Sequence, residues 1–87
     1  MRFPPDERQL LLAVRGVGPR VLERFEQMGV ASLAALADAH AADLLAQGAT
    51  LSGSSCWKNS PQARAAVEAA IAAALAEVDA RQAGGGG

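Results

Sequence analysis

The chain has 87 residues, enough for one small domain with a modest core but too few for a separate catalytic domain. Eight basic and nine acidic residues give a formal charge of −1, so no general positive field attracts nucleic acid. A single cysteine excludes an internal disulfide framework and the usual multi-cysteine zinc site.

Apolar residues at helical spacing, separated by glycine, proline and serine, predict an all-α fold of about five short helices. The expected helices cover residues 5–14, 19–28, 33–37, 41–47 and 61–83. A loop is expected over residues 47–59, where glycine, serine and asparagine dominate. One domain therefore spans residues 1–83, and the glycine tail 84–87 is expected to stop the last helix and to be disordered.

Several helix ends carry recognisable signals. Gly29 is expected to be the left-handed cap of the second helix, with Val30 folding back on Phe25. Ser32 is the expected N-cap of the third helix, and either Asn59 or Ser60 caps the last one. On that last helix the predicted core-facing stripe consists of Val67, Ile71, Leu75 and Val78.

A very short hairpin is predicted between the first two helices, at residues 15–20 (Arg-Gly-Val-Gly-Pro-Arg). Gly16 and Gly18 can both adopt the positive φ angles that a tight reversal needs. Pro19 suits the first helical turn, because its missing N–H has no intrahelical acceptor there.

The start of the second helix is predicted to form an anion site. The backbone N–H groups of Val17, Gly18 and Arg20 are expected to lack intrahelical partners, which leaves a positive concavity. Arg20 lies beside it, and Arg24 follows one turn later on the same face. An alternative is that these arginines are ordinary solvated charges, with Arg20 or Arg24 paired to Glu23 or Gln27.

This spacing resembles the helix-hairpin-helix family, whose motif is met here by Leu11, Val14, Gly16, Val17, Gly18 and Phe25. The segment 29–36 is similar to the continuation that commonly follows such hairpins. The resemblance implies a helix-hairpin-helix bundle, in which the fourth and fifth helices could form a degenerate second hairpin. It also implies that the hairpin amides bind the DNA backbone without reading sequence.

Our functional hypothesis is weak, sequence-independent DNA binding, accessory to repair, recombination or processing. The expected DNA-binding residues are Arg15, Gly16, Val17, Gly18, Arg20, Arg24 and Lys58. The alternative is a protein-interaction adaptor or homodimerising domain. It is motivated by the near-neutral charge and by Leu22, which stands where the family usually has a small residue.

No enzyme is expected, because no pair of acids falls in an evident cleft. We expect no cofactor, although relatives of the motif leave open a monovalent cation at the hairpin carbonyls. With no signal peptide or membrane-length apolar run, the expected location is cytoplasmic, without a membrane partner.

The segment Cys56-Trp57-Lys58 is unusual, because the only tryptophan and the only cysteine are adjacent in a polar stretch. One interpretation buries Trp57 as an anchor of the loop. The other exposes it for stacking on a base or a partner, with Lys58 on phosphate. Cys56 is interpreted as a small packing residue.

Overall fold

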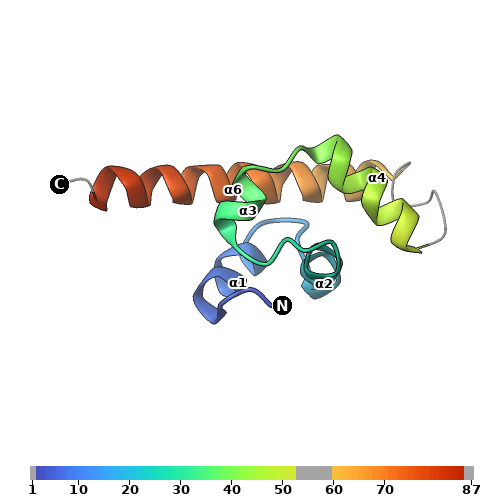
Figure 1. Cartoon of the computed structure of the whole chain (residues 1–87), viewed down its shortest axis with the longest axis horizontal. Coiled ribbons are helices and arrows are strands. Elements are labelled where there is room, and N and C mark those ends of the chain that lie inside the picture. The colour runs from blue at the N-terminus through green and yellow to red at the C-terminus, as the bar shows by residue number, and fades with distance from the viewer. Residues whose placement is uncertain (1, 53–59, 86–87) are drawn as a thin grey trace.

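One long helix, α6 (Pro61–Gly85), runs the length of the molecule, and four shorter helices complete the bundle (Figure 1). These are α1 (Pro5–Leu12), α2 (Pro19–Gln27), α3 (Leu33–Ala37) and α4 (Ala41–Ser52). The computed structural model describes residues 2–52 and 60–85, without the side chains of 51–52 and 83–85. Within these residues every regular element is a helix, which confirms the predicted all-α fold.

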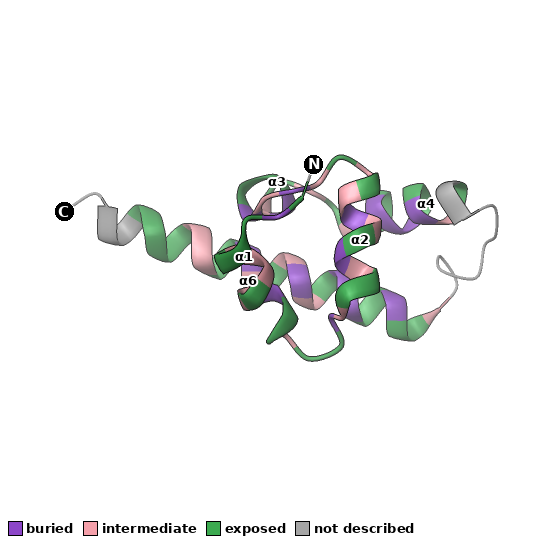
Figure 2. Cartoon of the chain, turned by 90° about the horizontal axis from the view of Figure 1, so that it is seen from below, coloured by how far each residue is buried: buried purple, intermediate pink, exposed green. Residues whose placement is uncertain are grey.

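The face of α6 that packs into the core is made mainly of alanine. Its buried residues recur every three or four positions: Ala63, Ala66, Val67, Ala70 and Ala74. Small side chains allow helices to approach closely, and α3 packs more extensively on α6 than any other helix does. Buried residues of α6 are confined to the part of the helix that the shorter helices cover, and none lies toward its C-terminal end among the residues whose burial is described (Figure 2).

The predicted stripe on the last helix was therefore wrong in its orientation. Of its residues only Val67 is fully buried, while Ile71 and Val78 are half-buried and Leu75 is 51% exposed. The alanine row occupies the position against α3, so the bulkier Ile71 and Leu75 lie toward the edge of the packed face. Larger side chains in that row would push α3 away.

The remaining core comes from large residues on the shorter helices and the N-terminal segment. The buried ones are Phe3, Leu11, Val17, Leu22, Phe25, Leu33, Leu36, Leu44 and Leu45. Fully burying a leucine or phenylalanine side chain stabilises a fold by about 1.5–3 kcal/mol, so this set supplies most of the cohesion of the shorter helices.

The predicted helix ends at Gly29, Ser32 and Ser60 are confirmed. Gly29 has φ 85°, its N–H donates to Glu26 O at 3.1 Å, and Val30 N donates to Phe25 O at 2.8 Å, which together form a Schellman motif. Ser32 Oγ accepts from Ala35 N at 3.1 Å. Ser60 Oγ accepts from Ala63 N at 3.2 Å, so Ser60 is the cap of α6.

Three helix boundaries differ from prediction by two residues or more. Helix α1 ends at Leu12 rather than residue 14, because Val14 N donates to Leu11 O and tightens the last turn. Helix α4 continues to Ser52, so the loop expected over 47–59 is wrong for its first six residues; the others lie outside the described ranges. Helix α6 runs past Gly84 to Gly85.

The extension of α4 has a tertiary cause. Gly48 lies inside the helix and is buried, and α4 contacts both α2 and α6. Packing of this kind overrides the low helix propensity of glycine. Helices α4 and α6 are in contact, but the degenerate second hairpin stays a prediction, because residues 53–59, which join the two helices, are outside the described part of the chain.

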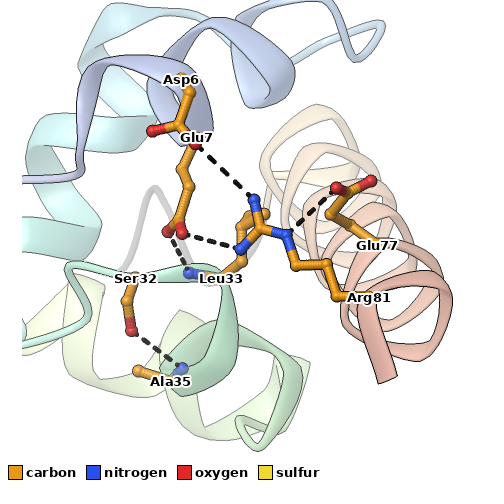
Figure 3. A network of polar contacts seen from close by, with 7 residues as sticks. All are labelled: Asp6, Glu7, Ser32, Leu33, Ala35, Glu77 and Arg81. Carbon is orange, nitrogen blue, oxygen red and sulfur yellow. Dashed lines mark hydrogen bonds and ion pairs between the residues drawn. The ribbon is translucent and has the colours of Figure 1, made fainter. Parts of the chain in front are cut away.

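A polar contact on Glu7 ties three helices together (Figure 3). Glu7 lies on α1, and its carboxylate accepts Leu33 N at the start of α3 at 2.8 Å and Arg81 Nη1 on α6 at 3.0 Å. Arg81 also donates to Glu77 at 3.2 Å and lies 3.8 Å from Asp6. The Glu7 side chain is only 12% exposed, so its bond with Leu33 N is partly shielded from water, whereas the Arg81 and Asp6 side chains are 45% and 74% exposed.

The hydrogen bond to Glu7 is the main cause that raises the pKa of Arg81 above its ordinary value, and the one to Glu77 also contributes. Because folding raises the pKa of this base, its protonated form stabilises the folded state. The stabilisation is fully present at pH values below the unfolded-state pKa, and it is lost as the pH rises through the folded-state pKa. For an arginine that window is strongly alkaline, so the Arg81 contact persists at all physiological pH values.

We predict that Glu7→Ala destabilises the protein by about 1–3 kcal/mol, because it leaves the Leu33 N–H without its acceptor and Arg81 without its principal partner. The free energy of unfolding in urea, followed by circular dichroism, measures this. The matched variant Arg81→Ala should cost less, because Arg81 is solvent-exposed and the Glu7 to Leu33 bond survives. Equal losses in the two variants would contradict the ranking.

Candidate functional site

The connection between α1 and α2, residues 13–18, is a tight turn closed by a backbone hydrogen bond. Val17 N donates to Val14 O at 3.0 Å, and Gly16 at the third position has φ 87°. Such a turn favours glycine at that position, because other L-residues are strained at positive φ. A Cβ on Gly16 would lie 3.9 Å from Ala66, an ordinary contact, so the backbone rather than crowding requires glycine.

Gly18 does not behave as predicted. Its φ is −113° and its ψ 178°, an extended conformation open to any residue, and a Cβ there would meet no atom of the described residues within 4 Å. Gly18 is the N-cap of α2, and its carbonyl accepts from Val21 N at 3.1 Å and Leu22 N at 3.3 Å. The folded chain therefore does not require glycine at this position.

The predicted set of open amides is correct for two of its three members. Val17 N is bonded to Val14 O, and the Val17 side chain is buried, so this residue anchors the turn instead of offering a donor. The N–H groups of Gly18 and Arg20 have no acceptor among the described residues. Both lie at the start of α2, where helix amides point outward.

The charge at this helix start is unusual. The first turn of α2 contains no acidic residue, whereas the first turn of α1 contains Asp6 and Glu7. The helix dipole favours negative charge at this end, but α2 has Arg20 there. An anion bound at the Gly18 and Arg20 amides would compensate both the dipole and the arginine.

The expected arginines have different surroundings. Arg15 and Arg20 are exposed and form no ion pair with any described residue. Arg24 is half-buried, and its Nη1 donates to Gln27 Oε1 at 3.2 Å, which was one of the pairings anticipated from the sequence. Lys58, with its neighbours Cys56 and Trp57, lies outside the described residues.

The exposed side of α2 also carries a carboxylate. Arg20, Glu23, Arg24 and Gln27 together line a shallow depression. A larger open groove beside it is lined by both arginines and acids, among them Arg2, Arg8, Glu23 and Glu26. Positive charge is therefore concentrated at the turn rather than spread over the whole face of α2.

Sequence reasoning missed the role of Glu26. Its carboxylate accepts the Phe3 N–H at 2.9 Å and lies 3.9 Å from Arg8 Nη1. These contacts hold the N-terminal segment on α2 and engage one of the two acids of that helix. No local pattern indicates them, because Phe3 and Glu26 are 23 residues apart.

The described residues contain neither a metal-binding cluster nor a membrane-spanning helix. Within residues 2–52 and 60–85, no three His, Cys, Asp or Glu residues are grouped so as to hold a metal ion. The same ranges contain no helix with the length and apolar character that a membrane crossing needs. The carbonyls of Val14 and Gly18, at the two ends of the turn, accept backbone hydrogen bonds, whereas those of Arg15, Gly16 and Val17 accept none from the described residues, so a monovalent cation at these carbonyls stays a prediction.

Comparisons of this chain with protein-family models, with curated proteins and with solved structures found no match. The functional argument therefore depends on the geometry of the turn.

The two glycines should respond differently to alanine. Gly16→Ala is expected to destabilise the fold by about 1–2 kcal/mol, because alanine must adopt a left-handed conformation. Gly18→Ala should change the free energy of unfolding by less than about 0.5 kcal/mol, since its backbone is extended and its surroundings are open. Thermal and urea unfolding of both variants measure this, and similar losses would contradict the observed turn geometry.

Proposed function

We propose that this chain binds the phosphodiester backbone of DNA, weakly and without sequence preference, as a helix-hairpin-helix module. The observation that carries the proposal is the start of α2, where the Gly18 and Arg20 amides are open and no first-turn acid competes with an incoming phosphate. The absence of a structural need for glycine at Gly18 adds support, because a glycine lets a ligand approach the backbone closely.

In this proposal one phosphate lies at the end of α2. Its oxygens accept hydrogen bonds from the Gly18 and Arg20 N–H groups, and the helix dipole favours its charge. Arg20 and Arg15, which form no ion pair within the part of the chain that the structure describes, supply charge-assisted contacts to the same or adjacent phosphates. Such contacts position the protein on the backbone and carry no base information.

Buried contacts keep the turn in shape during binding. Val17 and Leu22 lie in the core on either side of the open amides, and the bond from Val17 N to Val14 O closes the turn. Leu22 is fully buried, so the core accommodates its bulk at the position where the family usually has a small residue. The donors are thus held in place before the phosphate arrives, which lowers the ordering cost of binding.

Binding should be weak for electrostatic reasons. The formal charge is −1, and Glu23 lies between Arg20 and Arg24 on the exposed side of α2. Few phosphates are neutralised, so few counterions are released and the affinity gained from their release is small. Binding should therefore be measurable only at low salt. We place the chain as a binding accessory to DNA repair, recombination or processing, and not as an enzyme.

Glu23 also supports the alternative function, a protein-interaction adaptor that uses α2 without nucleic acid. A mixed surface of arginine and glutamate is typical of contacts with another protein, where complementary charges set specificity. DNA binding is the stronger proposal, because two open amides beside Arg15 and Arg20 suit a phosphate. The mixed charges of α2 do not by themselves identify a protein partner.

Replacement of Arg20 with glutamate should weaken binding to a short duplex by about tenfold or more at low salt, because it removes one phosphate contact and adds repulsion. A salt titration by fluorescence anisotropy should also give a shallower slope for this variant, by about one ion. Arg64→Glu, the same charge change on α6, is the matched control, and at protein concentrations low enough to keep the chain monomeric it should bind like the parent protein.

Two results would reject the proposal. One is duplex binding that stays undetectable at low salt, and the other is an affinity that Arg20→Glu leaves unchanged while the fold is intact by circular dichroism. Gly18→Ala refines the result: a loss of affinity without a loss of stability would place the phosphate at this amide.

A further inference from the structure

An apolar groove lies between α6 and the connection from α3 to α4. Its floor and walls include Ala37, Ala39, Ala41, Ile71, Ala72 and Leu75, and Asp38, His40 and Glu68 complete its lining. Leu75 is 51% exposed, and Leu12 is the other large hydrophobic side chain exposed in the described residues. An exposed leucine beside several apolar neighbours indicates a contact surface.

The groove faces away from the turn. Gly16 lies against Ala66 on α6, and Leu75 follows nine residues later, which is about two and a half helical turns. Leu75 therefore lies on the side of α6 opposite to the side that contacts the α1–α2 turn. A partner in the groove would leave the start of α2 accessible.

Two charges of opposite sign flank the groove symmetrically along α6. Arg64 and Asp79 are both exposed, and neither forms an ion pair within the described part of the chain. The point midway between them falls between Ile71 and Ala72, so each lies about 11 Å from it along the helix axis. At 100° per residue, Arg64, Leu75 and Asp79 share one face.

We propose that a second copy of this chain occupies the groove, with the two α6 helices packed antiparallel about a two-fold axis near Ile71 and Ala72. Only a self-complementary patch suits such an isologous contact, in which each residue meets its counterpart across the axis. The axis brings Arg64 of each copy against Asp79 of the other, giving two equivalent ion pairs. The charge pattern therefore fits another copy of the same helix.

The small residues of this face favour the same arrangement. Ala72 lies next to the axis, so the two helices can approach closely, and Ile71 and Leu75 supply the apolar centre. The α3–α4 connection of each copy forms a wall beside the helix of the other. One residue opposes the contact: Glu68 falls opposite Leu75 of the second copy, and burial of its charge should keep the dimer weak.

Charge exchange tests the pairing directly. In sedimentation equilibrium over a wide concentration range, Arg64→Asp and Asp79→Arg should each raise the dimer dissociation constant by about tenfold, because each places like charges together. The double variant Arg64→Asp/Asp79→Arg restores both pairs with their signs reversed, so it should recover most of the affinity. Arg20→Glu should leave dimerisation unchanged, so this test is independent of DNA binding.

Two further variants probe the centre of the contact. Leu75→Glu should abolish dimerisation without unfolding the chain, since the side chain is exposed. Glu68→Leu should tighten the dimer by about tenfold or more, because it replaces a charge opposite Leu75 with an apolar group. Circular dichroism checks the fold of every variant.

A parent protein that stays strictly monomeric at millimolar concentration would overturn the proposal and leave the groove to a different protein. Failure of the double variant to recover affinity would overturn the antiparallel pairing. Dimerisation that Leu75→Glu does not affect would overturn the location.

Discussion

The close approach of α3 to the alanine face of α6 is the contact on which the rest of the fold depends. The buried alanines of α6 leave room for a neighbouring helix, and α3 contributes its buried Leu33 and Leu36 to the same core. Helix α3 has only five residues and would not persist alone. Its capping by Ser32 and the carboxylate of Glu7 on Leu33 N fix where it starts. The same carboxylate holds Arg81, so the position of α3 also fixes α1 against the far end of α6.

This packing determines what the α1–α2 turn exposes. Gly16 lies against Ala66 and Val17 is buried in the core, so the inner side of the turn packs on the rest of the protein. The start of α2 is left on the outside, with two amides open. The three residues of the turn therefore differ in role. Gly16 adopts a positive φ and Val17 is buried in the core, whereas the extended backbone of Gly18 does not require glycine. The phosphate contact proposed above would use a glycine at such an unstrained, uncrowded position, because the backbone there is open to close approach.

Local signals were sufficient to predict the helix ends at Gly29, Ser32 and Ser60, because a cap depends on residues three or four positions apart. They were not sufficient where distant residues decide. The orientation of α6 was missed, since alanine has a weak hydrophobic signal and its advantage appears only when another helix packs on it. Helix α4 was predicted too short for a similar reason, because burial of Gly48 depends on tertiary contacts. The contacts of Glu7 with Leu33 and Arg81 span 26 and 74 residues, and the predicted open amide of Val17 was lost to a turn bond with Val14.

The formal charge of −1 is unevenly distributed, because some charged side chains are paired within the fold and others are not. Glu7 and Glu26, both largely buried, are engaged in holding the fold, and they engage Arg81 and Arg8 as well. Arg15 and Arg20 have no such partners among residues 2–52 and 60–85, so a nearly neutral chain still presents local positive charge at the start of α2. The field of such a small cluster is short-ranged in physiological salt, which limits what a single copy can hold. Two copies joined through the opposite side of α6 would carry two such clusters on one particle, and binding of the first would raise the effective concentration of the second. Weak phosphate contacts and a weak dimer would then reinforce each other wherever one DNA molecule can reach both turns.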